Sequence, residues 1–282
     1  MIAFRPIQLT DRAWVEACRD TRENPFTALS FPSLYSWKDT YGLAIGGDAD
    51  FFVVRSQHDQ AYYCPCGDAQ KCRTFIKEAG SREKEARFLY LTREQGEQMK
   101  KDGFFTLLRD DLSEYLASAS AVALTQGHHI THSFRIKIHH FQRDTAYSVR
   151  FITEQDLPAL RQFARDTADA SSDMGDLEVV NNLLDDFIPL GLQGVLLETE
   201  DGRRAFLLGY ENNPAEFTMT MAKHDPSLPA SMTMVIIHEM AVRLKEKYAL
   251  INLEEDLGLA GLRQAKLLYS PVDRLNVYEA IR

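Results

Sequence analysis

Long apolar runs are scarce in this sequence of 282 residues, which argues against a transmembrane architecture. No stretch approaches the roughly 18–20 residues that cross a bilayer, and one of the longest, Met232–Ile237, is ended by His238 and Glu239. Residues 1–14 carry charged side chains and lack the apolar centre of a secretory signal. We therefore expect a cytoplasmic protein with no membrane span.

Cysteine is also scarce. The chain has four cysteines, at Cys18, Cys64, Cys66 and Cys72. They are too few for a disulfide framework in a chain of this length, and a cytosol would keep them reduced. Cys64 and Cys66 lack the C-x-x-C spacing of a zinc site, and no second pair follows them. We expect buried or reactive thiols and no metal.

Sequence motifs of several enzyme classes are missing. The chain has no G-x-S-x-G, no G-x-x-x-x-G-K-[ST], no G-x-G-x-x-G and no H-E-x-x-H. His238-Glu239 matches half of the last motif, but Val242 stands where the second histidine would be. These absences argue against serine hydrolases of the α/β type, P-loop enzymes, dinucleotide-binding enzymes and zinc proteases.

Positive charge is in deficit. Lys and Arg number 32 against 41 Asp and Glu, which gives a formal net charge of −9. This balance disfavours a whole-surface attraction to nucleic acid, so a tRNA partner is disfavoured, although a local basic groove stays open. The length allows two domains or one large one.

An internal echo indicates two copies of one domain. Phe4–Thr21 (FRPIQLTDRAWVEACRDT) and Val149–Thr167 (VRFITEQDLPALRQFARDT) each read as a short strand, a helix start and an amphipathic helix. Each half then continues with apolar strands joined by a tight turn. We expect an N-terminal domain at 1–125, a helical connecting segment at 126–147, and a C-terminal domain at 148–282.

The second half gives the clearer pattern. We expect strands at 148–152, 194–199, 204–211, 216–222, 249–253 and 265–270, and helices at 154–167, 176–188, 229–247 and 258–264. In the first half, strands are expected at Phe51–Arg55 and Ala61–Cys64. Hairpin strands followed by a helical crossover predict an α/β (α+β) fold with a mixed, twisted sheet flanked by helices.

The connecting segment holds five of the eight histidines within Gln126–Arg143. Its apolar residues fit a helix, although part of the segment also alternates like a strand, and we favour the helix. His128 and His132 would then share a face and could bind a metal. The alternative is a solvated, partly cationic helix, and because supporting carboxylates are absent we expect no metal there.

Polar residues converge in Ile251–Pro271. If the strand at 249–253 continues, Asn252, Glu254 and Asp256 alternate onto one face, at the strand edge where α/β folds commonly bind ligands. Two carboxylates there would raise one another's pKa and could hold an amine or take its proton. Lys266 and Tyr269 are expected on the next strand. The alternative is an acidic surface turn with a structurally paired lysine.

Two motifs resemble a known family. The run N-L-E-E-D-L-G-L-A-G-L-R-Q-A-K-L-L-Y-S-P at Asn252–Pro271, together with S-F-P-S-L-Y-S-W at Ser30–Trp37, is similar to signatures of a bacterial family related to the C-terminal domain of phosphatidylglycerol lysyltransferases. The resemblance runs along the whole chain in order. It implies two GNAT-like (acyl-CoA N-acyltransferase) domains in tandem, as in Fem-type peptidyl transferases, and transfer of an aminoacyl or acyl group to an amine or hydroxyl.

The donor that the resemblance implies, acyl-CoA or an aminoacyl-tRNA, lacks a clear phosphate-binding motif here. GNAT proteins bind pyrophosphate with a glycine-rich loop, whereas residues 224–231 contain no glycine and two prolines. The segment 128–141, where relatives are rich in Lys, Arg and Asn, has several histidines instead. Either donor therefore stays an expectation, with a small-molecule or aminoacyl substrate as the partner.

These patterns support a transferase hypothesis with assigned roles. Glu254 or Asp256 would orient and deprotonate the acceptor, Lys266 would stabilise charge on the acyl group, and Tyr269 would donate a proton. Asn252, Glu255 and Arg263 are expected to contact the substrate. The rival hypothesis is a catalytically silent protein of the same fold that binds a cationic metabolite or a peptide end.

Overall fold

The structure is a computed structural model that divides into two compact units. It describes residues 2–125, 130–168 and 174–282. Unit 1 comprises Met1–Ser113 with Leu275–Arg282, and unit 2 comprises Glu114–Arg274. Unit 2 thus includes the described part of the segment that the sequence analysis set apart as a connection. Within the described residues, no helix is both long enough and apolar enough to cross a bilayer.

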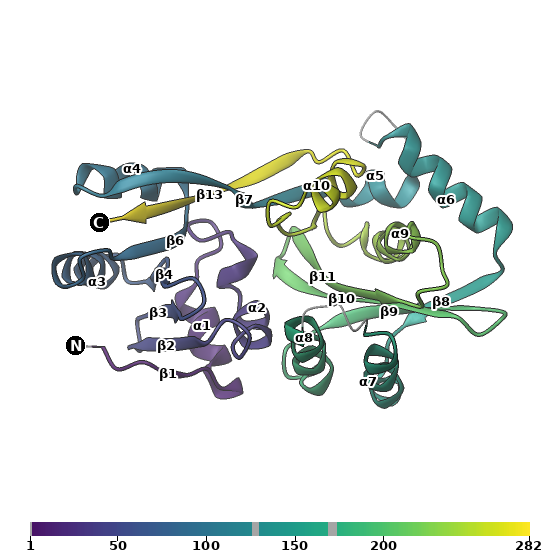
Figure 1. Ribbon diagram of the computed structural model, residues 1–282, viewed down its shortest axis with the longest axis horizontal. Coiled ribbons are helices and arrows are strands. Elements are labelled where there is room, and N and C mark those ends of the chain that lie inside the picture. Colours follow the sequence, from purple (N-terminus) through teal and green to yellow (C-terminus); the bar gives the residue numbers. More distant parts are fainter. Residues whose placement is uncertain (1, 126–129, 169–173) are drawn as a thin grey trace. The chain divides into compact units, whose positions relative to one another are not determined.

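Unit 1 is a mixed sheet with helices on its faces (Figure 1). Its strands are β1 (Arg5–Pro6), β2 (Leu43–Asp48), β3 (Phe51–Ser56), β4 (Ala61–Tyr63), β5 (Cys66–Gly67), β6 (Arg87–Leu91), the first part of β7 (Phe105–Ser118) and most of β13 (Asp273–Ile281). Its α-helices are α1 (Arg12–Cys18), α2 (Phe31–Ser36), α3 (Ala69–Arg82) and α4 (Arg93–Lys101). The strand order is β1-β2-β3-β4-β6-β13-β7, and β5 pairs with β3.

Unit 2 repeats this plan. Its strands are the end of β7, β8 (Tyr147–Phe151), β9 (Gln193–Thr199), β10 (Arg204–Asn213), β11 (Glu216–His224) and β12 (Leu250–Asn252), in the order β7-β12-β11-β10-β9-β8. Its α-helices are α5 (Ala119–Leu124), α6 (His132–Asp144), α7 (Leu157–Asp166), α8 (Met174–Asp185), α9 (Met232–Leu244) and α10 (Ala260–Leu267).

The two units share one chain path. In each, four strands pair antiparallel in sequence, and a helix then crosses over to a parallel fifth strand: α3 leads from β4 to β6, and α9 leads from β11 to β12. Short turns close the hairpins, with Gly202 at φ +85° after β9. The α/β fold class, with a mixed sheet flanked by helices, is confirmed.

The internal echo is visible at the level of single atoms. In unit 1 the Arg5 guanidinium binds both carboxylate oxygens of Asp11 at 2.6 and 2.8 Å, and in unit 2 Arg150 binds those of Asp156 at 2.6 and 2.7 Å. Each carboxylate also accepts a backbone N–H three residues earlier, at 2.8 Å in both units. The same bidentate pair therefore fixes the same strand-to-helix turn twice.

The core of unit 2 lies between its sheet and two helices. Figure 1 shows α6 and α9 on one face of strands β8–β11, with α7 and α8 on the other. Helix α9 is apolar on nearly all sides, as expected of a helix enclosed by its surroundings. Helix α6 buries only Phe134, Ile138 and Phe141, which recur at helical spacing. Its first turn is capped by the Thr131 hydroxyl, which accepts the N–H of Phe134.

Candidate active site

The acidic segment after β12 is a loop, so the predicted alternation of Asn252, Glu254 and Asp256 on one strand face is wrong. The strand ends at Asn252, and Glu254 and Leu257 have positive φ angles of 60° and 53°. The cause is local: Oδ1 of Asn252 accepts the backbone N–H of Glu254 at 2.8 Å. This bond between an asparagine and the backbone two residues on turns the chain out of the sheet.

The Asn252 side chain lies between two buried carboxylates. Its Nδ2 donates to Oε2 of Glu114 at 2.6 Å and to Oε1 of Glu216 at 3.0 Å. Glu216 also accepts from Nδ2 of Asn212 at 2.8 Å. Asn252, Glu114 and Glu216 are 0%, 1% and 4% exposed. Asn252 therefore uses both amide hydrogens and its carbonyl to hold the acidic loop against β7 and β11.

Glu254 is a half-buried carboxyl with a perturbed pKa. Burial raises the pKa of Glu254 well above its usual range, and the charge of Glu255, which is also half-buried, raises it further. The charge of Lys266 and a hydrogen bond with Thr220 act in the opposite direction but do not cancel the rise. A carboxyl with a raised pKa is, once ionised, a stronger proton acceptor than an ordinary carboxylate.

Lys266 lies on α10, so the predicted strand at 265–270 is wrong. Ala260–Leu267 forms a helix because most of its residues favour helix and tertiary packing leaves them out of the sheet. The Lys266 ammonium donates to the carbonyl oxygen of Leu253, one residue before Glu254. Burial lowers the pKa of Lys266, while the charges of Glu255 and Glu254 oppose this. Lys266 and Glu254 thus belong to one electrostatic cluster.

Asp256 is a fixed anion. It is 0% exposed and accepts from Oη of Tyr115 at 2.5 Å, Nε of Arg263 at 2.7 Å and the N–H of Gly258 at 2.8 Å. Burial alone would raise the pKa of Asp256, but the hydrogen bonds from Arg263, Tyr115 and Gly258 outweigh it and lower the pKa to about 2. A carboxylate with so low a pKa has little tendency to take up a proton, so Asp256 suits a structural role better than proton transfer.

Tyr269 lies beyond the end of α10 in the hydrophobic core of unit 2. Its side chain is 4% exposed, and its ring centroid lies 5.0 Å from that of Phe134. Burial raises the pKa of Tyr269. The structure therefore places Tyr269 in the packing between α6 and the segment after α10.

The sequence analysis did not identify three residues of this cluster. Glu114 and Tyr115 come from β7, and Glu216 begins β11, all remote in sequence from the acidic loop. The available signal was weak: Glu216 stands at the start of a mostly apolar strand, whereas the strand of Glu114 carries other charged residues as well. Only the strand order shows that these acids are neighbours of Asn252.

The histidines and cysteines that the sequence analysis weighed as metal ligands, and for which it expected no metal, lie in different places. His128 lies outside the described residues, and His132 is exposed at the start of α6. Cys64 and Cys66 are buried, and burial raises the pKa of both thiols. Among the residues that the structure describes, no group of three or more His, Cys, Asp or Glu side chains could hold a metal ion.

Comparison with known proteins agrees with the fold. A sequence model described as "Phosphatidylglycerol lysyltransferase, C-terminal" matches residues 22–281. Among solved structures, a conserved protein of unknown function from Bacteroides thetaiotaomicron is 26% identical, with 100% of this chain and 99% of that chain covered and a TM-score of 0.86. No curated protein sequence matches the chain.

Two more distant structures share the fold. L-PGS from Bacillus licheniformis is 15% identical, with 100% of this chain and 94% of that chain covered and a TM-score of 0.70. A tandem GNAT protein from the clavulanic acid biosynthesis pathway is 9% identical, with 100% and 98% covered and a TM-score of 0.51. The expected GNAT-like tandem fold is thereby confirmed.

Proposed function

Because this chain belongs to the family described as phosphatidylglycerol lysyltransferase, C-terminal, we propose that it transfers an acyl or aminoacyl group to an amine or hydroxyl acceptor, with its active site in unit 2. The proposal rests on one observation above all. A half-buried carboxyl of raised pKa, Glu254, shares an electrostatic cluster with a half-buried ammonium of lowered pKa, Lys266. Groups with opposed shifts of this kind are typical of acid–base chemistry.

Each step of the transfer has a group to serve it. Ionised Glu254 takes the proton of the acceptor amine or hydroxyl as the acceptor attacks the acyl carbon. The Lys266 ammonium stabilises the negative charge that develops on the acyl oxygen. When the tetrahedral intermediate collapses, the bond to the donor breaks, and Glu254 returns its proton to the leaving group. Asp256 and Asn252 position the loop and take no part in proton transfer.

The charge of the cluster favours a cationic group. Glu114, Glu216, Glu254, Glu255 and Asp256 contribute five carboxyl groups to it. Two cations already lie there: Arg263 pairs with Asp256, and the Lys266 ammonium donates to the carbonyl oxygen of Leu253. The free ammonium of an aminoacyl group would attract these carboxylates and offset the repulsion between them. The transferred group or the acceptor is therefore proposed to carry a positive charge, and the donor to be an aminoacyl-tRNA or an acyl-CoA.

Two measurements test this function. A thermal-shift screen of acyl-CoAs, aminoacyl-adenylate mimics, amino acids and polyamines identifies ligands, because a molecule that binds only the folded state stabilises it. Transfer from radiolabelled acyl-CoA and lysyl-tRNA is then measured for the wild type, Glu254→Gln and Glu246→Gln. Glu246 is 87% exposed and serves as the matched control. Turnover that survives Glu254→Gln unchanged contradicts the proposed role.

A second candidate function is a binding protein without turnover. The loop before α9 favours it, because this loop contains no glycine and its Asp225 carboxylate already accepts the N–H and the hydroxyl of Ser227, at 2.8 and 2.6 Å. Such a loop presents few free N–H groups to a donor's phosphates. Saturable binding of a cationic ligand with no transfer from either labelled donor would favour this candidate.

A further inference from the structure

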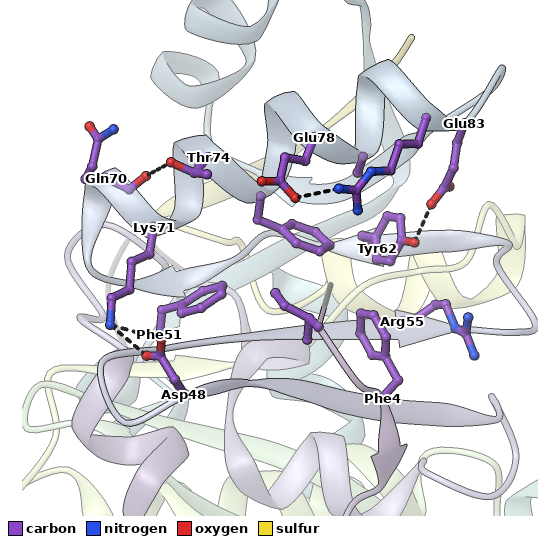
Figure 2. Close-up of a pocket in the computed structure, with 14 residues that line it drawn as sticks. Phe4, Asp48, Phe51, Arg55, Tyr62, Gln70, Lys71, Thr74, Glu78 and Glu83 are labelled. Carbon is purple, nitrogen blue, oxygen red and sulfur yellow. Dashed lines mark hydrogen bonds and ion pairs between the residues drawn. The ribbon is translucent and has the colours of Figure 1, made fainter.

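A hollow of about 490 Å³ lies in unit 1 between helix α3 on one side and strands β2 to β4 and the residues before β1 on the other. Its floor is aromatic, with Phe4, Phe51 and Tyr62 among the lining residues, which Figure 2 shows below α3, and Phe75 lines the hollow from α3 itself. The rings contact one another: the centroids of Tyr62 and Phe75 lie 5.1 Å apart, and those of Phe4 and Tyr62 lie 5.9 Å apart. Phe51 and Tyr62 are buried among these neighbours, whereas Phe4 and Phe75 are half-buried, so the hollow leaves part of the aromatic cluster accessible.

The strand registers identify the same surface in unit 2. In unit 1, Pro6 pairs with Ala44, which pairs with Arg55 on β3. In unit 2, Arg150 is the equivalent of Arg5, and the next residue pairs in the same way. Phe151 pairs with Val195, and Val195 pairs with Leu207 on β10. Arg55 therefore corresponds to Leu207. One strand further along, Tyr62 corresponds to Ala222.

In unit 2 helices α6 and α9 together cover this face of the sheet (Figure 1). Leu207 is 1% exposed and shares one core cluster with Phe134, Ile138 and Phe141 of α6. The ring of Phe141 packs 5.3 Å from that of Tyr147. By the same alignment, Tyr147 corresponds to Ile2, which lines the open hollow of unit 1. Thus an amphipathic helix fills in unit 2 what is open in unit 1.

Unit 1 has Arg55 where unit 2 has Leu207, and this difference indicates the charge of a molecule that would cover the hollow. Arg55 is exposed, and its guanidinium lies 5.1 Å from the centroid of the Phe4 ring. No carboxylate among the described residues pairs with it, whereas the other cations of the rim, Lys71 and Arg82, pair with Asp48 and Glu78. A component that covers this hollow would leave a buried, unpaired guanidinium unless it supplied an acid.

We propose that the hollow beside α3 binds an amphipathic helix of a partner protein, with aromatic or aliphatic residues at positions i, i+4 and i+7 and a carboxylate that faces Arg55. The apolar stripe enters the aromatic floor as the stripe of α6 does in unit 2. The carboxylate pairs with the guanidinium at the rim. This interaction does not depend on the transferase activity proposed for unit 2.

The test uses the full chain and two fluorescein-labelled peptides. The basic peptide has the sequence of residues 131–144, which carries the α6 stripe. The acidic peptide is the same sequence with Arg135→Glu and Lys137→Glu. We expect the acidic peptide to bind at least tenfold more tightly in fluorescence anisotropy titrations. Arg55→Glu should reverse this preference, and Arg55→Gln should abolish it.

The matched control is Arg73→Glu, on the side of α3 that lines a different hollow. It should leave the preference unchanged. Phe75→Ala should weaken both peptides, because it removes the aromatic ring with which α3 lines the hollow. The proposal is overturned if neither peptide binds below about 100 µM, if Arg73→Glu acts like Arg55→Glu, or if only small aromatic or fatty carboxylates bind at the hollow.

Discussion

Helices α3 and α9 make the same crossover in the two units, yet only α9 is enclosed. Nine side chains of α9 are buried, whereas Ala79 is the single buried residue of α3. Helix α3 has hollows of about 490 and 580 Å³ on its two sides. The comparison teaches that a repeated backbone does not require repeated packing: α6 and α5 complete the surroundings of α9, and no described segment of unit 1 does this for α3.

The segments that follow the parallel strands differ in the same way. After β6, Thr92 caps α4 at once, with its hydroxyl accepting the N–H of Gln95 and the Gln95 side chain accepting the N–H of Thr92. After β12, Asn252 turns the chain into the acidic loop before α10 begins. At this position unit 1 therefore has a helix cap, and unit 2 has a cluster of charged groups in which the pKa of Glu254 is raised and that of Lys266 is lowered.

The largest expected effect is the loss of transfer in Glu254→Gln. If unit 2 alone carries the chemistry, this change should lower kcat about 10²–10⁴-fold, because it removes the group that takes the acceptor's proton. Wild-type activity should rise with pH as Glu254 ionises, through a pKa raised above the usual value. The variant should lose this pH dependence. Rates of transfer between pH 5 and 9 provide the measurement.

Stability separates this role from a structural one. A carboxyl whose pKa is raised on folding stabilises the protein below its usual pKa and loses that contribution as pH rises through the raised value. At neutral pH, Glu254→Gln should therefore unfold in urea at the same or a higher concentration than the wild type. A variant that loses stability and activity together would show that Glu254 is a structural partner of Lys266.

The next prediction compares the packing of α9 and α3 through the same substitution, isoleucine to alanine, in each helix. Ile236→Ala on α9 should cost about 2–5 kcal/mol, because the side chain is 1% exposed and leaves a cavity in a closed core. Ile76→Ala on α3 should cost less than about 1 kcal/mol, because that side chain is half-buried beside an existing hollow. Urea unfolding of both variants measures the difference, and equal losses would contradict the contrast between the helices.

The sequence predicted most elements of unit 2 because their patterns are local. Apolar alternation predicted β9, β10 and β11, and the repeated order of short strand, helix start and amphipathic helix carried the echo between Phe4–Thr21 and Val149–Thr167. The site was harder to predict for two physical reasons. The turn at Asn252 depends on a side chain accepting a backbone N–H, which reverses the expected alternation. Glu114 and Glu216 reach Asn252 only through strand pairing across distant segments.

The acid sensitivity of unit 2 should depend on Asp256. Its pKa is lowered to about 2, so it stabilises the fold above pH 3.8, and this contribution disappears as pH falls toward 2. The shift corresponds to about 2 kcal/mol. Asp256→Asn should lose about that much at pH 7 and differ little from the wild type near pH 2. Asp144→Asn, which breaks the exposed pair with Arg143, should change stability little at either pH.

The smallest effect tests the repeat itself through Asp11→Asn and Asp156→Asn. Both carboxylates bind an arginine through two bonds and accept one backbone N–H, so each change should cost about 1 kcal/mol at pH 7. Burial would raise the pKa of Asp11, but the hydrogen bonds from Arg5 and the backbone outweigh it, and the pKa is lowered. The hydrogen bonds from Arg150 likewise lower the pKa of Asp156. Both contributions are therefore present above pH 3.8 and fade in acid.

If the two turns are equivalent, the two losses should agree within about 0.5 kcal/mol and add in the double variant, because the pairs lie in different units and share no partner. Urea unfolding at pH 7 and pH 3 measures both quantities, and hydrogen exchange of the helices that follow, α1 and α7, assigns each loss to its unit. A loss at Asp11 but none at Asp156 would mean that only unit 1 needs the pair, because Asp156 is the more exposed of the two carboxylates, at 14% against 5%. The two units would then have the same turn geometry, but the turn would contribute to the free energy of unfolding only in unit 1.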